Sequence, residues 1–290
     1  MEETDSTREP ESPHLDSRGQ PTATLEPSPA GSPSFVYALG QIVPRFPSLS
    51  VEKEFAQVTG RAGASGGLTD REALEAVLSD GSNRYLVRQL CWILVIEGLE
   101  TYLLTPRDPA DLGLLAAAVR PRPDPTDLDV VIGILGPLTP PEACGLVVPI
   151  VAFDQLYSFD RDTLVGAIPT PGDLSKKEAE RFRATAAELL DRILQLADNA
   201  GATDEHRALN YLAVRYPAIY AQTATAHGDN ASLTEVDVRP SRLSGFRTVL
   251  DVIFSYTHRQ TDVTQKYFVR VDVTEEFPFL VTKLSPYYDR

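Results

Sequence analysis

The sequence is poor in several features that define whole classes of protein. Its 290 residues include one Trp, one Met, two Cys and four His. The longest apolar stretches, around Ile93 and around Val148, are far shorter than the roughly 20 residues that cross a bilayer. The acidic residues at the start of the chain are not followed by the apolar segment of a signal peptide. We therefore expect a cytoplasmic protein without a membrane span.

Positive charge is scarce as well. The chain has 27 Lys and Arg against 41 Asp and Glu, which gives a formal net charge of -14. A protein that binds nucleic acid or an anionic membrane surface non-specifically needs a basic face that releases counterions. We therefore expect neither nucleic acid nor membrane among its partners.

Metal and cofactor motifs are missing. Closely spaced ligands such as C-x-x-C or H-x-x-x-H do not occur, so no metal site is predicted. Neither a G-x-x-x-x-G-K loop nor a dinucleotide glycine motif after a strand occurs, so no cofactor is predicted. The two cysteines, Cys91 and Cys144, have apolar neighbours and are expected as reduced, buried side chains. A disulfide or a reactive thiol is the alternative.

Composition divides the chain near residue 34. Residues 1–34 hold six of the 23 prolines, seven acidic and two basic residues, and no Ile, Val, Phe, Tyr or Trp. So little apolar area cannot offset about 1–2 kcal/mol of ordering entropy per residue, so this acidic, proline-rich segment is predicted to be disordered. The folded remainder is expected in two parts, 35–120 and 121–290, because three prolines fall in residues 121–125.

Strand patterns occur along much of the folded part. An element that begins at Phe35 is expected to stop at Pro44 and Pro47. Residues 90–96 and 99–104 predict two strands around a Glu97-Gly98 turn, with a buried helix as the alternative. Strand-length apolar runs follow at 128–135 and 146–153. Residues 250–257 and 266–273 alternate apolar with polar side chains, which predicts an antiparallel hairpin.

Helical patterns lie between these strands. Residues 176–198 carry apolar side chains at three- and four-residue spacing and predict a long amphipathic helix. Thr203 is expected to begin another helix, which ends near Tyr216. Because strands and helices come in blocks rather than in strict alternation, the predicted fold class is α+β, with antiparallel sheets packed against helices.

Two motifs have a structural explanation. Residues 63–67, Gly-Ala-Ser-Gly-Gly, match the nucleophile pattern G-x-S-x-G. That mechanism needs a strand-to-helix elbow, whereas these residues lie between two predicted helices and are expected to be a linker. The pairs Asp127/Asp129 and Asp160/Asp162 are spaced like catalytic carboxylates, but they flank a strand and a turn, where aspartates commonly serve as turn and cap residues.

One histidine has suggestive neighbours. His206 follows Thr203, Asp204 and Glu205 and precedes Arg207. One hypothesis makes His206 a general base that Asp204, Glu205 or Arg207 assists, because a helix N-terminus favours the neutral imidazole that a base needs. The alternative is that the acidic residues cap the helix and that His206 is a partly buried side chain on its apolar face.

Three arginines are close together between predicted strands. Arg239, Arg242 and Arg247 have the chemistry to bind a carboxylate or an acidic peptide, because a guanidinium donates two parallel hydrogen bonds to a carboxylate. Salt bridges within the fold are the alternative interpretation. These arginines and the His206 group are the candidate site residues of the sequence.

Several longer segments resemble a known family. They are residues 37–40 (YALG), 44–57 (PRFPSLSVEKEFAQ), 203–216 (TDEHRALNYLAVRY) and 271–290 (VDVTEEFPFLVTKLSPYYDR). Together they resemble the C-terminal domain of the PatA/PatG cyanobactin maturation proteins, a domain that also occurs alone in other bacteria. The resemblance covers residues 35–290.

The resemblance implies a context rather than a reaction. In that family the domain follows protease and macrocyclase domains that process ribosomally made precursor peptides, but this chain has none of their Asp/His/Ser motifs. The shared domain is of unknown function and supplies no catalytic residues. We predict a non-enzymatic accessory domain that binds a precursor peptide or a maturation protease, with a sheet edge as one means of binding a strand. The alternatives are an enzyme that uses His206 and a dimerisation or scaffold module.

Overall fold

The computed structural model describes most of the chain. The described residues are 33–61, 69–124, 126–140, 142–168, 175–196 and 198–288. The predicted acidic tail, apart from its last two residues, and the glycine-rich residues 63–67 lie outside this part of the chain. Ser34–Arg290 form one compact unit by their internal contacts. The unit has an α+β fold, as predicted.

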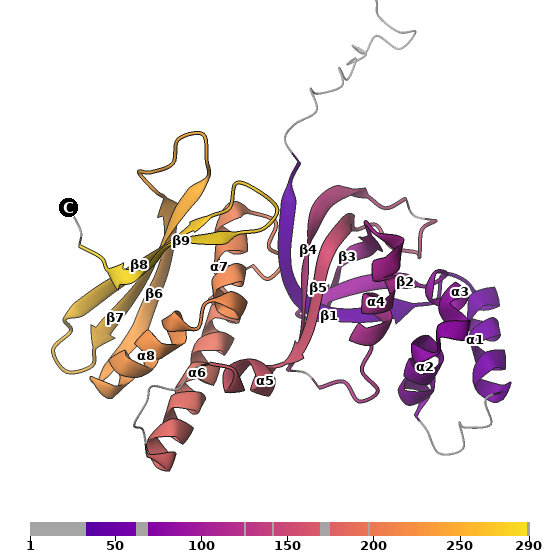
Figure 1. The fold of residues 1–290 in the computed structure, drawn as a ribbon, viewed down its shortest axis with the longest axis horizontal. Coiled ribbons are helices and arrows are strands. Elements are labelled where there is room, and N and C mark those ends of the chain that lie inside the picture. The colour runs from indigo at the N-terminus through magenta and orange to yellow at the C-terminus, as the bar shows by residue number, and fades with distance from the viewer. Residues whose placement is uncertain are drawn as a thin grey trace, which may run out of the picture. The chain divides into compact units, whose positions relative to one another are not determined.

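The first sheet is a closed barrel with strand order β1-β2-β3-β5-β4 (Figure 1). Its strands are β1 (Phe35–Arg45), β2 (Cys91–Ile96), β3 (Leu99–Pro106), β4 (Asp127–Leu138) and β5 (Pro149–Asp160). Neighbouring strands are antiparallel except β3 and β5, which are parallel. The barrel strands lie on both sides of residue 121, so the predicted boundary between two folded parts runs through the barrel rather than between sheets.

Strand β1 closes the barrel by changing partners. Its first half, up to Gly40, pairs with β4, and its second half pairs with β2. The strand ends at Arg45, between the two prolines predicted to stop it, and Pro44 itself lies within β1 opposite Trp92. Beyond Gly40 the strand pairs on one side only, and a strand with one paired side tolerates a proline.

The predicted hairpin at residues 90–104 is confirmed. β2 and β3 pair in antiparallel register, and they are joined by Glu97 and Gly98, whose φ angles are 51° and 82°. Two successive positive φ values are those of a type I′ turn, which matches the twist of the flanking strands. The alternative of a buried helix over this segment is therefore excluded.

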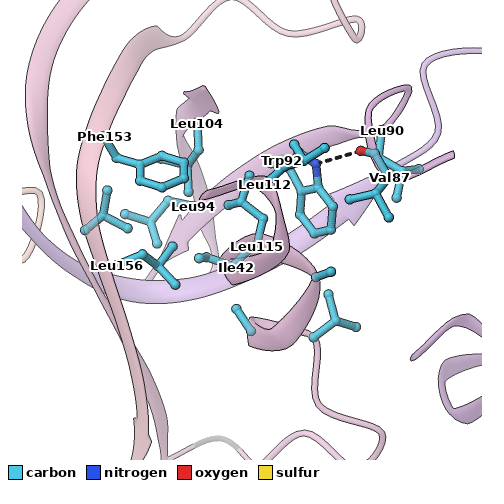
Figure 2. Close-up of a cluster of buried hydrophobic side chains, with 14 of the residues drawn as sticks. Ile42, Val87, Leu90, Trp92, Leu94, Leu104, Leu112, Leu115, Phe153 and Leu156 are labelled. Atoms are coloured by element: carbon cyan, nitrogen blue, oxygen red, sulfur yellow. Dashed lines mark hydrogen bonds between the residues drawn. The ribbon is translucent and has the colours of Figure 1, made fainter. Parts of the chain in front are cut away.

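Helices pack against the barrel and complete the first core. They are α1 (Leu49–Arg61), α2 (Asp70–Ser79), α3 (Arg84–Val87) and α4 (Leu112–Ala118), with 3-10 turns at Gly81–Asn83 and Pro109–Asp111. Figure 2 shows Leu112 and Leu115 of α4 among the barrel side chains Ile42 and Leu94, all of which are buried. The Trp92 indole N–H donates to the Val87 carbonyl at 3.1 Å, so the buried tryptophan also has its polar atom satisfied.

The second sheet is open and has strand order β6-β7-β8-β9. Its strands are β6 (Ala231–Pro240), β7 (Val249–His258), β8 (Thr264–Asp272) and β9 (Phe279–Pro286), and the helices α5 (Arg161–Gly166), α6 (Lys176–Leu196), α7 (Asp204–Arg215) and α8 (Ala218–Gly228) precede it. The predicted β7–β8 hairpin is confirmed, with Thr257 opposite Thr264. The inner face of this sheet shares a core with α6, α7 and α8.

The segment before α7 joins the open sheet and its helices to the barrel. The Tyr37 amide donates to the Gly201 carbonyl at 3.1 Å, and the Leu39 amide donates to the Asn199 carbonyl at 2.8 Å. These bonds use the edge of β1 that does not face β4. The buried Asn210 side chain of α7 donates to the Tyr37 carbonyl at 2.8 Å. The barrel and the C-terminal elements are thus joined by backbone hydrogen bonds as well as by apolar packing.

The expectation of reduced cysteines is wrong. Cys91, at the start of β2, and Cys144, between β4 and β5, form a disulfide with their Cα atoms 6.1 Å apart. The residues are 53 positions apart, and nothing in that spacing signals a pair. The fold brings them together because β2 and the segment between β4 and β5 meet at the end of β1, where Arg45 donates to the Cys144 carbonyl. No helix in the described part of the chain is long and apolar enough to span a membrane.

Candidate binding surface

The predicted group around His206 lies in the first turn of α7. The Thr203 hydroxyl accepts the His206 amide at 3.3 Å and caps the helix, as expected. Glu205 is exposed, and the His206 ring is partly exposed, with Nδ1 3.9 Å from an Asp198 carboxylate oxygen. This Nδ1 has no hydrogen-bond partner among the described residues. The arrangement places His206 at a capped helix terminus, near the Asp198 carboxylate.

Arg207 has a structural position. Its side chain is 2% exposed and donates to the carbonyls of Val273 at 2.8 Å, Glu276 at 3.3 Å and Glu275. Asp204 neutralises its charge at 3.0 Å. Burial lowers the pKa of the Arg207 guanidinium, and the Asp204 carboxylate opposes this effect. A side chain with all these partners inside the fold is not available to a substrate.

Three of the four paired aspartates, Asp127, Asp129 and Asp160, have structural partners. Arg120 lies 3.5 Å from Asp127 and 3.3 Å from Asp129, and the buried Asp129 carboxylate accepts the Ile42 amide at 2.7 Å. Burial raises the pKa of Asp129 even though Arg120 opposes the shift. Asp160 accepts the Thr163 amide at 2.6 Å and caps α5, so its pKa is lowered.

Two of the three predicted arginines lie in ion pairs beside aromatic rings. Arg239 pairs with Asp237 at 2.5 Å, and its guanidinium carbon is 6.0 Å from the centre of the Tyr287 ring. Arg247 pairs with Asp272 at 2.6 Å and lies 5.1 Å from the Phe279 ring. Arg242 is exposed in the loop between β6 and β7. Arg239 and Arg247 therefore have different partners within the fold.

Large apolar side chains are exposed at one end of the sheet, in two loops and at the start of β9. Leu243 is 62% exposed and Phe246 is 96% exposed in the loop between β6 and β7. Phe277 and Phe279, beyond β8, are 40% and 45% exposed. The loops are joined where the Val273 amide donates to the Thr248 carbonyl at 2.9 Å and the Thr248 amide donates to the Thr274 hydroxyl at 2.8 Å.

We call Leu243, Phe246, Phe277 and Phe279, together with Arg242 and Arg247, the loop-end surface. Exposed apolar side chains rimmed by polar residues mark interaction sites more often than chance. Aromatic side chains and arginine are also the residue types that dominate binding energy in protein interfaces. Sequence reasoning identified the two arginines but missed the four apolar residues. For Leu243 and Phe246 the sequence holds one signal. These two apolar residues lie in a polar, glycine-containing stretch that has no strand pattern.

The two edge strands of the open sheet, β6 and β9, differ in the partners of their backbone groups. The Leu284 amide of β9 donates at 2.9 Å to the hydroxyl of Tyr216, the residue after α7, so this side chain occupies part of the strand's backbone. β6 pairs with β7 on one side and has no strand on its other side in the described part of the chain. An added strand is therefore better accommodated at β6 than at β9.

Comparison with known proteins supports the resemblance seen in the sequence. Residues 176–287 match the family described as PatG C-terminal. The chain is also similar to a solved structure described as "PatG Domain of Unknown Function", with a TM-score of 0.69 and 21% identity over 88% of this chain and 99% of that one. No curated protein matches the chain. The predicted resemblance to the PatG C-terminal domain is thus confirmed, and the loop-end surface lies within the matched residues.

Proposed function

We propose that this protein is a non-enzymatic recognition domain that binds a segment of a partner polypeptide at the loop-end surface. The observation that carries the proposal is the exposure of four large apolar side chains, above all Phe246, at the end of the sheet where hydrogen bonds join two loops. Full burial of a phenylalanine contributes about 1.5–3 kcal/mol, so two or three such contacts support a specific complex.

The partner's chemistry follows from the surface. Apolar side chains of the partner would pack against Leu243, Phe246 and Phe277, and a carboxylate would pair with the exposed Arg242. The resemblance to the PatG C-terminal domain suggests a precursor peptide or its maturation protease as that partner. A role in the maturation of ribosomally made peptides is accordingly part of the proposal.

The cytoplasmic location expected from the sequence also remains a proposal. The Cys91–Cys144 disulfide weighs against it, because cytoplasmic proteins keep most thiols reduced. Alkylation of free thiols in intact cells, followed by mass spectrometry, would distinguish the two cases. Two labelled cysteines would support the cytoplasm, and none would support an oxidising compartment.

Calorimetric titration with candidate precursor peptides and with the protease would test the function. We expect Phe246→Ala to weaken binding about tenfold, because loss of a buried ring costs at least 1.4 kcal/mol. Leu99→Ala is the matched control, since Leu99 is 72% exposed but lies on the barrel strand β3. Equal affinities of the two variants would exclude the loop-end surface. Absence of binding to every peptide and to the protease would overturn the proposed function.

A further inference from the structure

A hollow lies at the end of the open sheet opposite to the loop-end surface. Strand β7 begins at Val249, next to the loop that carries Phe246, and ends at His258, which lines the hollow. A strand of this length spans about 30 Å. The hollow has a volume of about 350 Å³ and lies between helix α8, the start of β6 and the β7–β8 hairpin. Its volume is in the range of small-molecule sites, and a small ligand there would not reach the loop-end surface.

Two tyrosines give the hollow an aromatic wall. Tyr256 and Tyr267 both line it, and their ring centres are 6.0 Å apart with an angle of 73° between the ring planes. Tyr256 is 2% exposed, and its hydroxyl is hydrogen-bonded to the Thr223 hydroxyl at 2.8 Å, so its ring is held in place. Tyr267 is only partly buried, so part of its side chain stays accessible. The wall therefore offers a preformed aromatic surface to the apolar face of a ligand ring.

The His258 ring lines the same hollow and is oriented by the β7–β8 turn. Its Nδ1 accepts the backbone amides of Gln260 and Thr261, each at 3.2 Å. A neutral imidazole whose Nδ1 is an acceptor carries its proton on Nε2. Within the described part of the chain, no residue accepts a hydrogen bond from this Nε2. The ring therefore has one N–H group left to donate to a ligand.

The other polar side chains of the lining favour a neutral ligand with several hydroxyl groups. Asp229, directly after α8, supplies a carboxylate, and Gln222 and Gln265 supply side-chain amides. A carboxylate accepts hydrogen bonds from two hydroxyls at once, and an amide both donates and accepts. The lining includes no Lys or Arg among its described residues, whereas the Asp229 carboxylate repels anions. A phosphate or carboxylate group on the ligand is therefore disfavoured.

We propose that this hollow binds the neutral pyranose ring of a sugar. Such a ring has an apolar face of C–H groups and hydroxyls that each donate and accept, which is the combination that this lining matches. One face of the sugar would pack on Tyr267, two hydroxyls would donate to Asp229, and another would accept from His258 Nε2. A free monosaccharide and one unit of an oligosaccharide share this chemistry. The proposal is independent of the function assigned to the loop-end surface.

Titration of the full-length protein with the methyl glycosides of glucose, galactose and mannose tests the proposal, with the amide resonances of Thr261 and Gln265 as NMR readouts. Cyclohexanol is the control for apolar packing, and adenosine is the control for an aromatic base. We expect at least one glycoside to shift both resonances at millimolar concentration and to leave the amide of Phe246 unchanged. Absence of a shift with all three glycosides, or an equal or larger shift with cyclohexanol or adenosine, would overturn the proposal.

Variants identify the site. Asp229→Asn keeps the side-chain shape and should weaken binding of the best glycoside about fivefold, because a charged acceptor is lost. Tyr267→Leu should also weaken it, whereas Tyr267→Phe keeps the ring and should preserve most of the affinity. Asp262→Asn is the matched control, because Asp262 is exposed in the same hairpin, lies outside the lining and has a φ of 55° that Asn tolerates. Unchanged affinity in both Asp229→Asn and Tyr267→Leu would contradict the assignment to this hollow.

Thermal unfolding checks that the variants fold, and the exposed Asp229 keeps the test usable where Tyr267→Leu does not fold. The source of the sugar follows from a second comparison. Tighter binding of a trisaccharide of the same sugar than of its methyl glycoside would assign the site to oligosaccharides. Equal or weaker binding of the trisaccharide would assign it to free monosaccharides.

Discussion

The Arg207 guanidinium donates a 2.8 Å hydrogen bond to the Val273 carbonyl and so joins the first turn of α7 to the end of β8. The same side chain donates to the carbonyls of Glu275 and Glu276, and its guanidinium carbon lies 5.2 Å from the centre of the Phe35 ring. One buried arginine therefore organises the segment before β9 and contacts the start of β1. Phe277, which belongs to the loop-end surface, follows this segment directly.

Replacement of Arg207 by Met should destabilise the protein by about 2–5 kcal/mol, because buried carbonyls would lose their donor. The measurement is equilibrium unfolding in urea. His206→Ala is the control on the same helical turn and should change the free energy of unfolding by less than about 0.5 kcal/mol. A loss smaller for Arg207→Met than for His206→Ala would contradict the structural role of Arg207.

Gly201→Ala should be among the most damaging small substitutions. A Cβ at Gly201 would lie 1.9 Å from the Tyr37 carbonyl oxygen, and the residue has a φ of 59°. The clash and the backbone strain should together cost about 3 kcal/mol or more and separate β1 from the segment before α7. Gly228→Ala is the matched control, because a methyl group there would meet nothing within 4 Å beyond its own turn of helix. Thermal unfolding of the two variants should differ clearly, and equal midpoints would show that this junction adapts.

Local patterns predicted much of the fold, because they depend on neighbours in the sequence. The Glu97-Gly98 turn and the alternation around Phe254 were sufficient to predict both hairpins, and Thr203 predicted the cap of α7. The parallel pairing of β3 with β5 and the exchange of partners along β1 depend on contacts between distant residues. α8 was not predicted, because residues such as Ala218 and Ala226 form no clear apolar stripe and tertiary packing stabilises the helix.

The candidate site also combines features that the local sequence predicts with features that depend on distant contacts. Arg239 and Arg247 were identified from their chemistry, but their partners Asp237 and Asp272 depend on strand pairing. Arg207 was grouped with His206 because the two are adjacent in the sequence, although their side chains have different surroundings. Exposure of Phe246 could not be inferred, because a phenylalanine is usually buried and its accessibility depends on the packing of the whole loop.

The Cys91–Cys144 disulfide should contribute measurably to stability. It spans 53 positions, and a loop of that length has a chain-entropy contribution of about 4 kcal/mol. The double variant Cys91→Ser/Cys144→Ser should therefore unfold at a lower urea concentration than the oxidised protein. Treatment of the original protein with a thiol reductant should cause a similar loss. An unchanged midpoint in both experiments would mean that the disulfide does not constrain the unfolded chain.

The pKa values of Asp129 and Asp160 should be shifted in opposite directions from the ordinary aspartate value of 3.8. Burial raises the pKa of Asp129, whereas hydrogen bonds from Thr163 lower the pKa of Asp160. Carboxyl ¹³C resonances followed over acidic pH should show Asp160 losing its proton well before Asp129. The same midpoint for both would contradict the buried environment of Asp129.

The two shifts also predict opposite effects of pH on stability. The folded state holds the Asp129 proton more tightly, so the contribution of Asp129 is present below pH 3.8 and is lost as pH rises through its folded pKa. Asp160 contributes above pH 3.8 and loses its contribution as pH falls through its folded pKa. Urea unfolding should compare the free energy of unfolding of the original protein with that of each Asn variant. The value for the original protein minus that for Asp129→Asn should fall as pH rises, whereas the value for the original protein minus that for Asp160→Asn should increase. Parallel pH profiles for the two variants would show that neither shift is coupled to folding.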